Sequence, residues 1–284
     1  MDHVTEYTQE YIDRGDHRLG LHVYPDPGGD APVVAIWPAM GVPARYYRPF
    51  AADLRAAGCA VIVADLRGTG SSTPPPSRRC RYGYAELADD VGAVLDALKS
   101  RLDGRRVVLL GHSLGGQVCA LYLALNPHAT VDGLALVAVG LPYHRAYPRA
   151  GLRVLLSTQA IAATSALLRV WPGWGFGGRQ ARGVIRDWAY TARTGRFPRL
   201  DGVDAEAALG SVTTPVLAVS VQRDQYTPSA TLDHLCAKLT AAPVTRERYT
   251  ADEAGAPLDH FRWVRAGAPL AARVASFAGA LPRR

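Results

Sequence analysis

Residues 107–120 read VVLLGHSLGGQVCA: an apolar run ends at Gly111, one serine follows at position 113, and a second apolar run begins after Gly115. A glycine-x-serine-x-glycine pattern between a strand and a helix predicts a very tight turn that carries Ser113. Only glycine leaves room where strand and helix nearly touch, and the serine hydroxyl stands clear of the backbone. The amide of Leu114 would then lie at a helix N-terminus, where negative charge is favoured. We interpret Ser113 as a nucleophile.

The same pattern also arises by chance in a chain with 28 glycines, and its serine would then only fill a turn. The context favours the nucleophile, because a buried-type strand precedes the motif and a helix follows it.

The length and composition fit one large α/β domain. The chain has 284 residues and 48% hydrophobic residues, enough to bury a core without disulfides. No apolar run approaches the ~18 residues of a membrane span, and residues 1–20 are too polar for a signal peptide. The cysteines at 59, 80, 119 and 236 show no paired spacing. We therefore expect a cytoplasmic protein with reduced thiols and no membrane span.

The charge pattern does not predict a nucleic-acid partner. The formal net charge is +7, but apart from residues 78–81 and the terminal arginine pair, the arginines are dispersed. Net charge without a basic patch indicates only solubility and weak steering. We also find no histidine–glutamate zinc motif and no cluster of cysteine and histidine, so no metal or organic cofactor is expected.

Strands and helices alternate along the chain. Apolar strands are expected at residues 32–37, 59–64, 107–111, 131–139, 215–221 and 244–249, with an N-terminal pair at 4–11 and 18–24. Helices are expected at residues 46–57, 84–102, 114–125 and 229–239, and residues 261–281 are expected to be largely helical. This alternation predicts a mostly parallel sheet with helices on both faces.

Between residues 140 and 209 the alternation stops. Helical stretches at 154–170 and 183–194 flank an aromatic and glycine-rich segment at 171–178. We expect residues 1–140 and 210–284 to form the core domain and residues 141–209 a cap or lid over the site. The alternative is a distorted part of the core's own helical layer. The aromatic residues Trp171, Trp174, Phe176 and Trp188 would either line a dry pocket or simply pack the cap.

A serine nucleophile needs a base, and the base needs an acid that orients it. Catalytic groups gather where parallel strands end, and Asp224 and His260 each follow one of the last two strands. Asp259 is adjacent to His260 and cannot easily reach its Nδ1, and Asp132 precedes its strand. We therefore predict Ser113, His260 and Asp224 as the catalytic residues.

The oxyanion of the reaction would need two amide donors. Leu114 supplies one, and the loop Pro38-Ala39-Met40-Gly41 follows the strand expected to supply the other, so we predict the Met40 amide. The alternative is that Met40 merely fills a tight loop.

The elbow Gly111-His112-Ser113-Leu114-Gly115-Gly116, with Asp65-Leu66-Arg67-Gly68-Thr69-Gly70-Ser71 upstream, resembles the α/β-hydrolase superfamily, in its branch of bacterial serine hydrolases. The loop at 38–41 stands where many members carry a histidine–glycine turn. The resemblance covers nearly the whole chain. It implies an eight-stranded, mostly parallel sheet, a helical cap between strands six and seven, and acyl-enzyme chemistry.

From these features we expect a serine hydrolase that cleaves a carboxylic ester, thioester or amide of a small-molecule acyl substrate. Two alternatives stay open: acyl transfer or cyclisation by the same triad, and a non-catalytic ligand-binding protein of this fold. The sequence does not name the acyl group or the oligomeric state.

Overall fold

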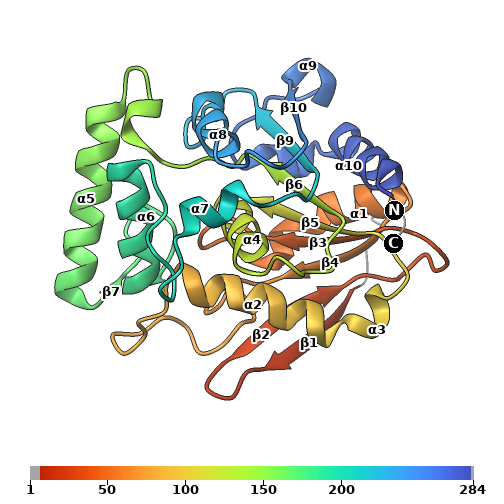
Figure 1. Ribbon diagram of the computed structural model, residues 1–284, viewed down its shortest axis with the longest axis horizontal. Coiled ribbons are helices and arrows are strands. Elements are labelled where there is room, and N and C mark those ends of the chain that lie inside the picture. Colours follow the sequence, from red (N-terminus) through yellow and green to blue (C-terminus); the bar gives the residue numbers. More distant parts are fainter. Residues whose placement is uncertain (1–6, 283–284) are drawn as a thin grey trace.

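One eight-stranded sheet forms the centre of the molecule (Figure 1), in a computed structural model that describes residues 7–282. From edge to edge the order is β1 (Thr8–Asp13), β2 (Arg18–Val23), β4 (Ala60–Ala64), β3 (Val33–Trp37), β5 (Val107–His112), β6 (Gly133–Val137), β9 (Val216–Val221) and β10 (Val244–Tyr249). Neighbours from β4 to β10 are parallel, whereas β2 is antiparallel to both β1 and β4. The expected fold class is confirmed. Residues 4–6 of the first expected strand lie outside the described residues.

Helices cover both faces of the sheet. One face packs against α1 (Arg48–Ala56) and α10 (Ala268–Ala280), and the other against α2 (Tyr84–Ala97), α4 (Leu114–Leu125) and α8 (Ser229–Cys236). Within β5, Leu109 belongs to one core and Leu110 to the other. A strand buried on both faces has no polar positions, which explains the continuous apolar runs.

Some helical boundaries differ from the sequence expectation. The helix expected at 84–102 is divided at Leu98 into α2 and α3 (Lys99–Leu102). The segment 261–281, expected to be largely helical, contains two helices: the short η3 (Arg262–Arg265) precedes α10, which carries Pro269 in its first turn. Proline is tolerated there but not in a helix interior, so one continuous helix is excluded. The expected loop at 251–257 contains α9 (Ala251–Ala254), capped by Thr250 and Glu253.

Between β6 and β9 lie the elements of the segment 141–209 that we propose as the cap. They are η2 (His144–Ala146), α5 (Gly151–Leu168), β7 (Val170–Trp171), β8 (Gln180–Ala181), α6 (Arg182–Thr194) and α7 (Ala205–Gly210). The helices α5 and α6 pack on each other at one side of the sheet, with α5 outermost, whereas α7 returns to pack on α4 (Figure 1). The insertion point, between the sixth and seventh strands of the sheet, is the one implied by the resemblance.

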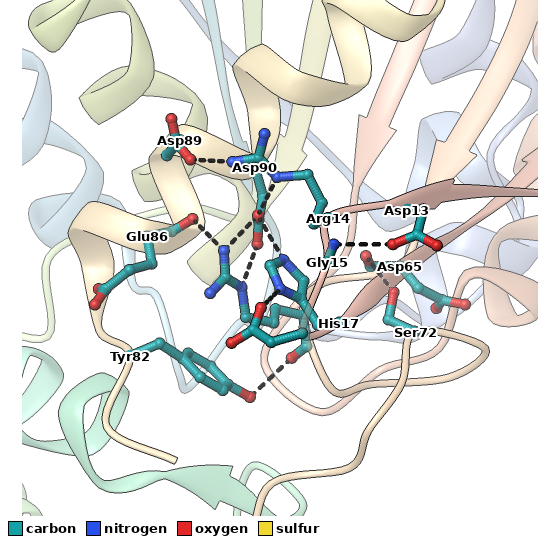
Figure 2. Close-up of polar contacts among 12 residues, drawn as sticks. Asp13, Arg14, Gly15, His17, Asp65, Ser72, Tyr82, Glu86, Asp89 and Asp90 are labelled. Carbon is teal, nitrogen blue, oxygen red and sulfur yellow. Dashed lines mark hydrogen bonds and ion pairs between the residues drawn. The ribbon is translucent and has the colours of Figure 1, made fainter.

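A buried carboxylate ties the β1–β2 hairpin to α2 and to the loop after β4 (Figure 2). Asp90 of α2 accepts hydrogen bonds from Nε and Nη2 of Arg67, at 2.8 and 2.6 Å, and lies 3.3 Å from Nε2 of His17. Arg14 of the hairpin pairs with the neighbouring Asp89. Because the Asp90 carboxylate is buried, losing a cationic partner would leave an uncompensated charge. The loop that follows β4 is therefore held firmly from the α2 side.

Candidate active site

Ser113 occupies the strained turn that the sequence predicts. Its backbone has φ 54° and ψ −118°, and it stands immediately before α4. A Cβ added at Gly111 would lie 2.1 Å from the Cα of Gly116, and one added at Gly115 would lie 2.1 Å from the carbonyl oxygen of Trp37. The glycines are thus required by contact between backbones. A serine at positive φ is uncommon, and such strain clusters at functional sites.

Asp224 and His260 form a buried hydrogen-bonded pair. Nδ1 of His260 lies 2.7 Å from Oδ2 of Asp224, whose side chain is fully buried. Thr227 donates its hydroxyl to the same carboxylate at 2.6 Å, and the amides of Tyr226 and Thr227 donate at 2.8 Å. Burial alone would raise the pKa of Asp224, but the bonds with His260 and Thr227 outweigh it and hold that pKa below its ordinary value. The carboxylate is therefore ionised and can fix the imidazole tautomer.

The two rejected acids have other partners. Asp259 accepts hydrogen bonds from the amides of Phe261 and Arg262, both at 2.8 Å. Asp132 accepts from the amide of Val107, at the opposite end of β5 from the serine. Asp259 makes no hydrogen bond with His260 among the described residues.

Ser113 and His260 line the same cavity, which has a volume of about 670 Å³. Within residues 7–282, no hydrogen bond joins the Ser113 hydroxyl to the imidazole. With Nδ1 held by Asp224, Nε2 is the ring nitrogen available to a nucleophile. The structure thus brings together the predicted acid and the predicted base, and the predicted nucleophile lines the same cavity as the base.

The two predicted oxyanion donors are the backbone amides of Leu114 and Met40. Leu114 is the first residue of α4, and Met40 lies in the turn after β3 and lines the cavity. Within the described part of the chain, neither amide donates a hydrogen bond. Such amide donors beside the Ser113 turn can bind the negative charge that develops on a substrate oxygen.

A buried tyrosine, which sequence reasoning missed, supports the loop that carries Met40. The hydroxyl of Tyr47 accepts a hydrogen bond from the amide of Ala39 at 2.9 Å and lies 2.7 Å from Nδ1 of His112. Because the oxygen accepts from Ala39, its own proton can be donated to the histidine. Burial, reinforced by the nearby His260, lowers the pKa of His112 well below its ordinary value, so the ring is a neutral acceptor.

Asp65, in the loop after β4, holds in place the short helix that carries Tyr47. Asp65 accepts hydrogen bonds from the amide of Ala44 at 2.6 Å and from the amide and hydroxyl of Ser71 at 2.8 and 2.7 Å. Ala44 begins η1 (Ala44–Tyr47), which ends at the tyrosine. A Cβ at Gly70 would lie 2.2 Å from this carboxylate, which explains the second glycine of the loop. The Asp-x-Arg-Gly-x-Gly-Ser pattern was visible in the sequence, but it did not show that Asp65 would bind the amide of Ala44.

Aromatic rings form much of the cavity wall. Phe176 stacks between Trp188 and Tyr226, with ring centroids 4.9 and 6.2 Å apart, and all three rings line the cavity. Of the four aromatic residues for which cavity lining and cap packing were both open, Phe176 and Trp188 line the cavity, whereas Trp171 and Trp174 do not. Trp171 is buried and donates its indole N–H to the carbonyl of Phe176, and Trp174 is 67% exposed. Among residues 7–282, no group of three or more histidine, cysteine, aspartate or glutamate residues could hold a metal ion.

Comparison with known proteins finds a matching family profile and a relative in sequence. The sequence profile of the family described as serine aminopeptidase, S33, matches residues 30–251. RutD of Variovorax paradoxus (strain S110), named as a candidate carbamate hydrolase, is 31% identical over 221 residues, which cover 74% of this chain and 80% of RutD. The family match extends over most of the chain.

Solved structures share the fold. A hydrolase from Pseudomonas aeruginosa PA01 is 20% identical with a TM-score of 0.62, covering 96% of this chain and 99% of that one. An esterase from Rhodococcus sp. ECU1013 is 21% identical with a TM-score of 0.60, covering 97% and 99%. At such identities the likeness extends to the fold alone.

Proposed function

The chain belongs to the serine aminopeptidase S33 family within the α/β-hydrolase superfamily, and we propose that it is a serine hydrolase acting through an acyl-enzyme on Ser113. The substrate would be a carboxylic ester, thioester or amide of a small molecule. The main support for the proposal is that the strained Ser113 turn and the Asp224–His260 pair meet at one cavity, which Ser113 and His260 both line.

In the proposed mechanism, the Ser113 hydroxyl attacks the carbonyl carbon and gives its proton to Nε2 of His260. Asp224 holds Nδ1–H of that ring and stabilises the imidazolium that forms. The amides of Leu114 and Met40 donate hydrogen bonds to the oxyanion of the tetrahedral intermediate. His260 then returns the proton to the leaving group, and water enters by the reverse sequence to release the acid.

The cavity favours an acyl group with an apolar or aromatic part. The rings of Phe176, Trp188 and Tyr226 offer apolar contact area, and the buried Gln117 is already satisfied by Tyr84 and by the carbonyl of Gly140. Burying apolar substrate surface against these rings would stabilise the complex. The carbamate and ester chemistry named for the relatives is acyl transfer to water, which this arrangement can perform.

The test is hydrolysis of p-nitrophenyl esters of increasing acyl length by wild type and Ser113→Ala. We expect Ser113→Ala to lower kcat by about 10⁴-fold or more, since no other group takes over the nucleophile's role. Ser157→Ala is the matched control, because Ser157 lines the same cavity but lies far along the chain, on α5. It should lower kcat/KM by no more than about tenfold. Equal rates for wild type and folded Ser113→Ala would contradict the proposal.

A further inference from the structure

The helix α5 carries apolar side chains on its outer face as well as on its inner one, where Ile161 and Ala162 pack against the core. Its most exposed large residues are leucines: Leu152 is 70% exposed, Leu156 62% and Leu167 83%. The two residues of this helix that are fully buried are Thr158 and Ser165, both polar. The leucines recur at a spacing of four and eleven residues, so they share one face. An apolar face turned outward indicates a surface that something else covers.

This face is fixed to the folded protein. α5 packs on α6, and Gln159 donates its side-chain amide to the carbonyl of Ala189 at 2.9 Å. Trp174, 67% exposed, lies edge-on to Trp171, with ring centroids 6.1 Å apart. Within residues 7–282, α5 is the one helix whose length and apolar composition would suffice to cross a bilayer, and 11% of it is buried. Because it is a wall of the cavity on its other side, the helix is placed to lie on a surface and not to cross one.

The charge around this face is strongly one-sided. Residues 141–200 contain ten arginines and one aspartate, and no carboxylate occurs between Asp132 and Asp187. Arg145, Arg149 and Arg169 flank α5, and Arg153 lies in its first turn, where it also borders the cavity; all four are exposed. In the part of the chain that the structure describes, none of their side chains makes an ion pair or hydrogen bond. Unpaired cations beside an apolar face suit an anionic, apolar partner.

We propose that the outer face of α5, with Trp174, docks on a bilayer that contains anionic phospholipids. The defining residues of this docking face are Leu152, Leu156, Leu167, Trp174 and the flanking arginines. Leucine and tryptophan side chains enter the boundary between headgroups and acyl chains, while arginines contact the phosphates. α5 lies at the outer edge of the molecule, away from the sheet, so a flat surface can reach it (Figure 1).

Self-association through the same face is disfavoured by charge. Two copies would bring eight exposed, unpaired arginines together with no carboxylate between them, and like charges in an interface oppose association. A bilayer supplies both the negative charge and the apolar volume. The docking proposal does not depend on the proposed hydrolase activity, because it concerns binding alone.

The test measures partition of the full chain onto vesicles by sedimentation. Vesicles of phosphatidylcholine with phosphatidylglycerol are compared with phosphatidylcholine alone, at low and high salt. We expect binding to the anionic vesicles that falls with salt. Arg145→Gln/Arg149→Gln should weaken it about thirtyfold, from ~1 kcal/mol for each arginine near an anionic surface. Leu156→Ser/Leu167→Ser should weaken it by at least about tenfold.

Tyr11→Ser is the matched control, since Tyr11 is 49% exposed on β1, an edge strand of the sheet. It removes an exposed apolar ring without touching α5 and should bind as wild type does. All variants change exposed residues, so thermal melting should show them folded. The proposal is overturned if wild type does not prefer anionic vesicles, or if the leucine or arginine variants bind as wild type does. It is equally overturned if wild type is a dimer that the leucine variant dissociates and neither binds vesicles.

Discussion

Replacing Tyr47 by phenylalanine removes one hydroxyl that serves two buried partners. The amide of Ala39 loses its acceptor and Nδ1 of His112 loses its donor, while the ring volume stays filled. A buried group left without a partner costs ~1–3 kcal/mol, so two give an expected loss of about 2–6 kcal/mol in the free energy of unfolding. No cavity contribution is added, because phenylalanine occupies the same space.

The variant should also lose activity through the loop that carries Met40. Without the bond from Ala39 to the hydroxyl, the neighbouring Met40 amide is no longer held where the oxyanion forms. We expect kcat to fall by about 10–100-fold, with KM nearly unchanged, because the contact is made to the transition state. A variant with the stability of the wild type and a reduced kcat would still support the positioning role of Tyr47.

The assay is urea unfolding followed by tryptophan fluorescence, for which Trp263 beside Tyr47 is a local probe. Tyr46→Phe is the control. The Tyr46 hydroxyl is only half-buried and donates one bond to the carbonyl of Phe261, at 2.9 Å. We expect it to lose about 1 kcal/mol or less. If Tyr47→Phe unfolds at the same urea concentration as Tyr46→Phe and keeps wild-type kcat, the argument for this network is refuted.

Three further predictions concern the turn, the buried histidine and the acid. Gly115→Ala should unfold or express poorly, because its Cβ would meet a backbone carbonyl at 2.1 Å, whereas Gly279→Ala in α10 meets nothing and should stabilise by ~0.5–1 kcal/mol in thermal melts. The pKa of His112 is lowered in the folded state, so its contribution to stability is full above the unfolded pKa of about 6.5 and is lost as the pH falls below it. The free energy of unfolding measured from pH 7 to 5 should therefore fall more steeply, by up to ~1.4 kcal/mol per pH unit, in wild type than in His112→Leu. Asp224→Asn should lower kcat by about 10⁴-fold in the ester assay, and Asp259→Asn by less than about tenfold; the reverse order would assign the acid to position 259.

The sequence was sufficient where the constraint is local. The turn at Ser113 is set by glycines two residues away on either side, where a side chain would collide with backbone, so the motif determines its own geometry. The strands could be predicted for a similar reason, because a strand buried on both faces, such as β5, must be apolar throughout. Asp224 and His260 follow the last two strands, where side chains of a parallel sheet converge.

Contacts between distant segments were beyond such reasoning. Tyr47 and His112 are 65 residues apart, and nothing in either local pattern marks them as partners. The helical spacing at 154–170 predicted a helix but not its outward apolar face, because periodicity does not say which side meets solvent. For the same reason Trp171 and Trp174 could not be placed. Within 261–281, Pro269 marks the first turn of α10, because proline is tolerated there and not in a helix interior.

Whether Ser113 is an activated nucleophile is tested most directly by labelling with a fluorophosphonate probe, followed by intact-mass analysis and peptide mapping. We predict a single adduct on the wild type, located on Ser113, and none on folded Ser113→Ala. We also predict much slower labelling of His260→Ala, because the base that removes the proton is gone. An adduct on another residue, or equal labelling of wild type and Ser113→Ala, would contradict the proposal.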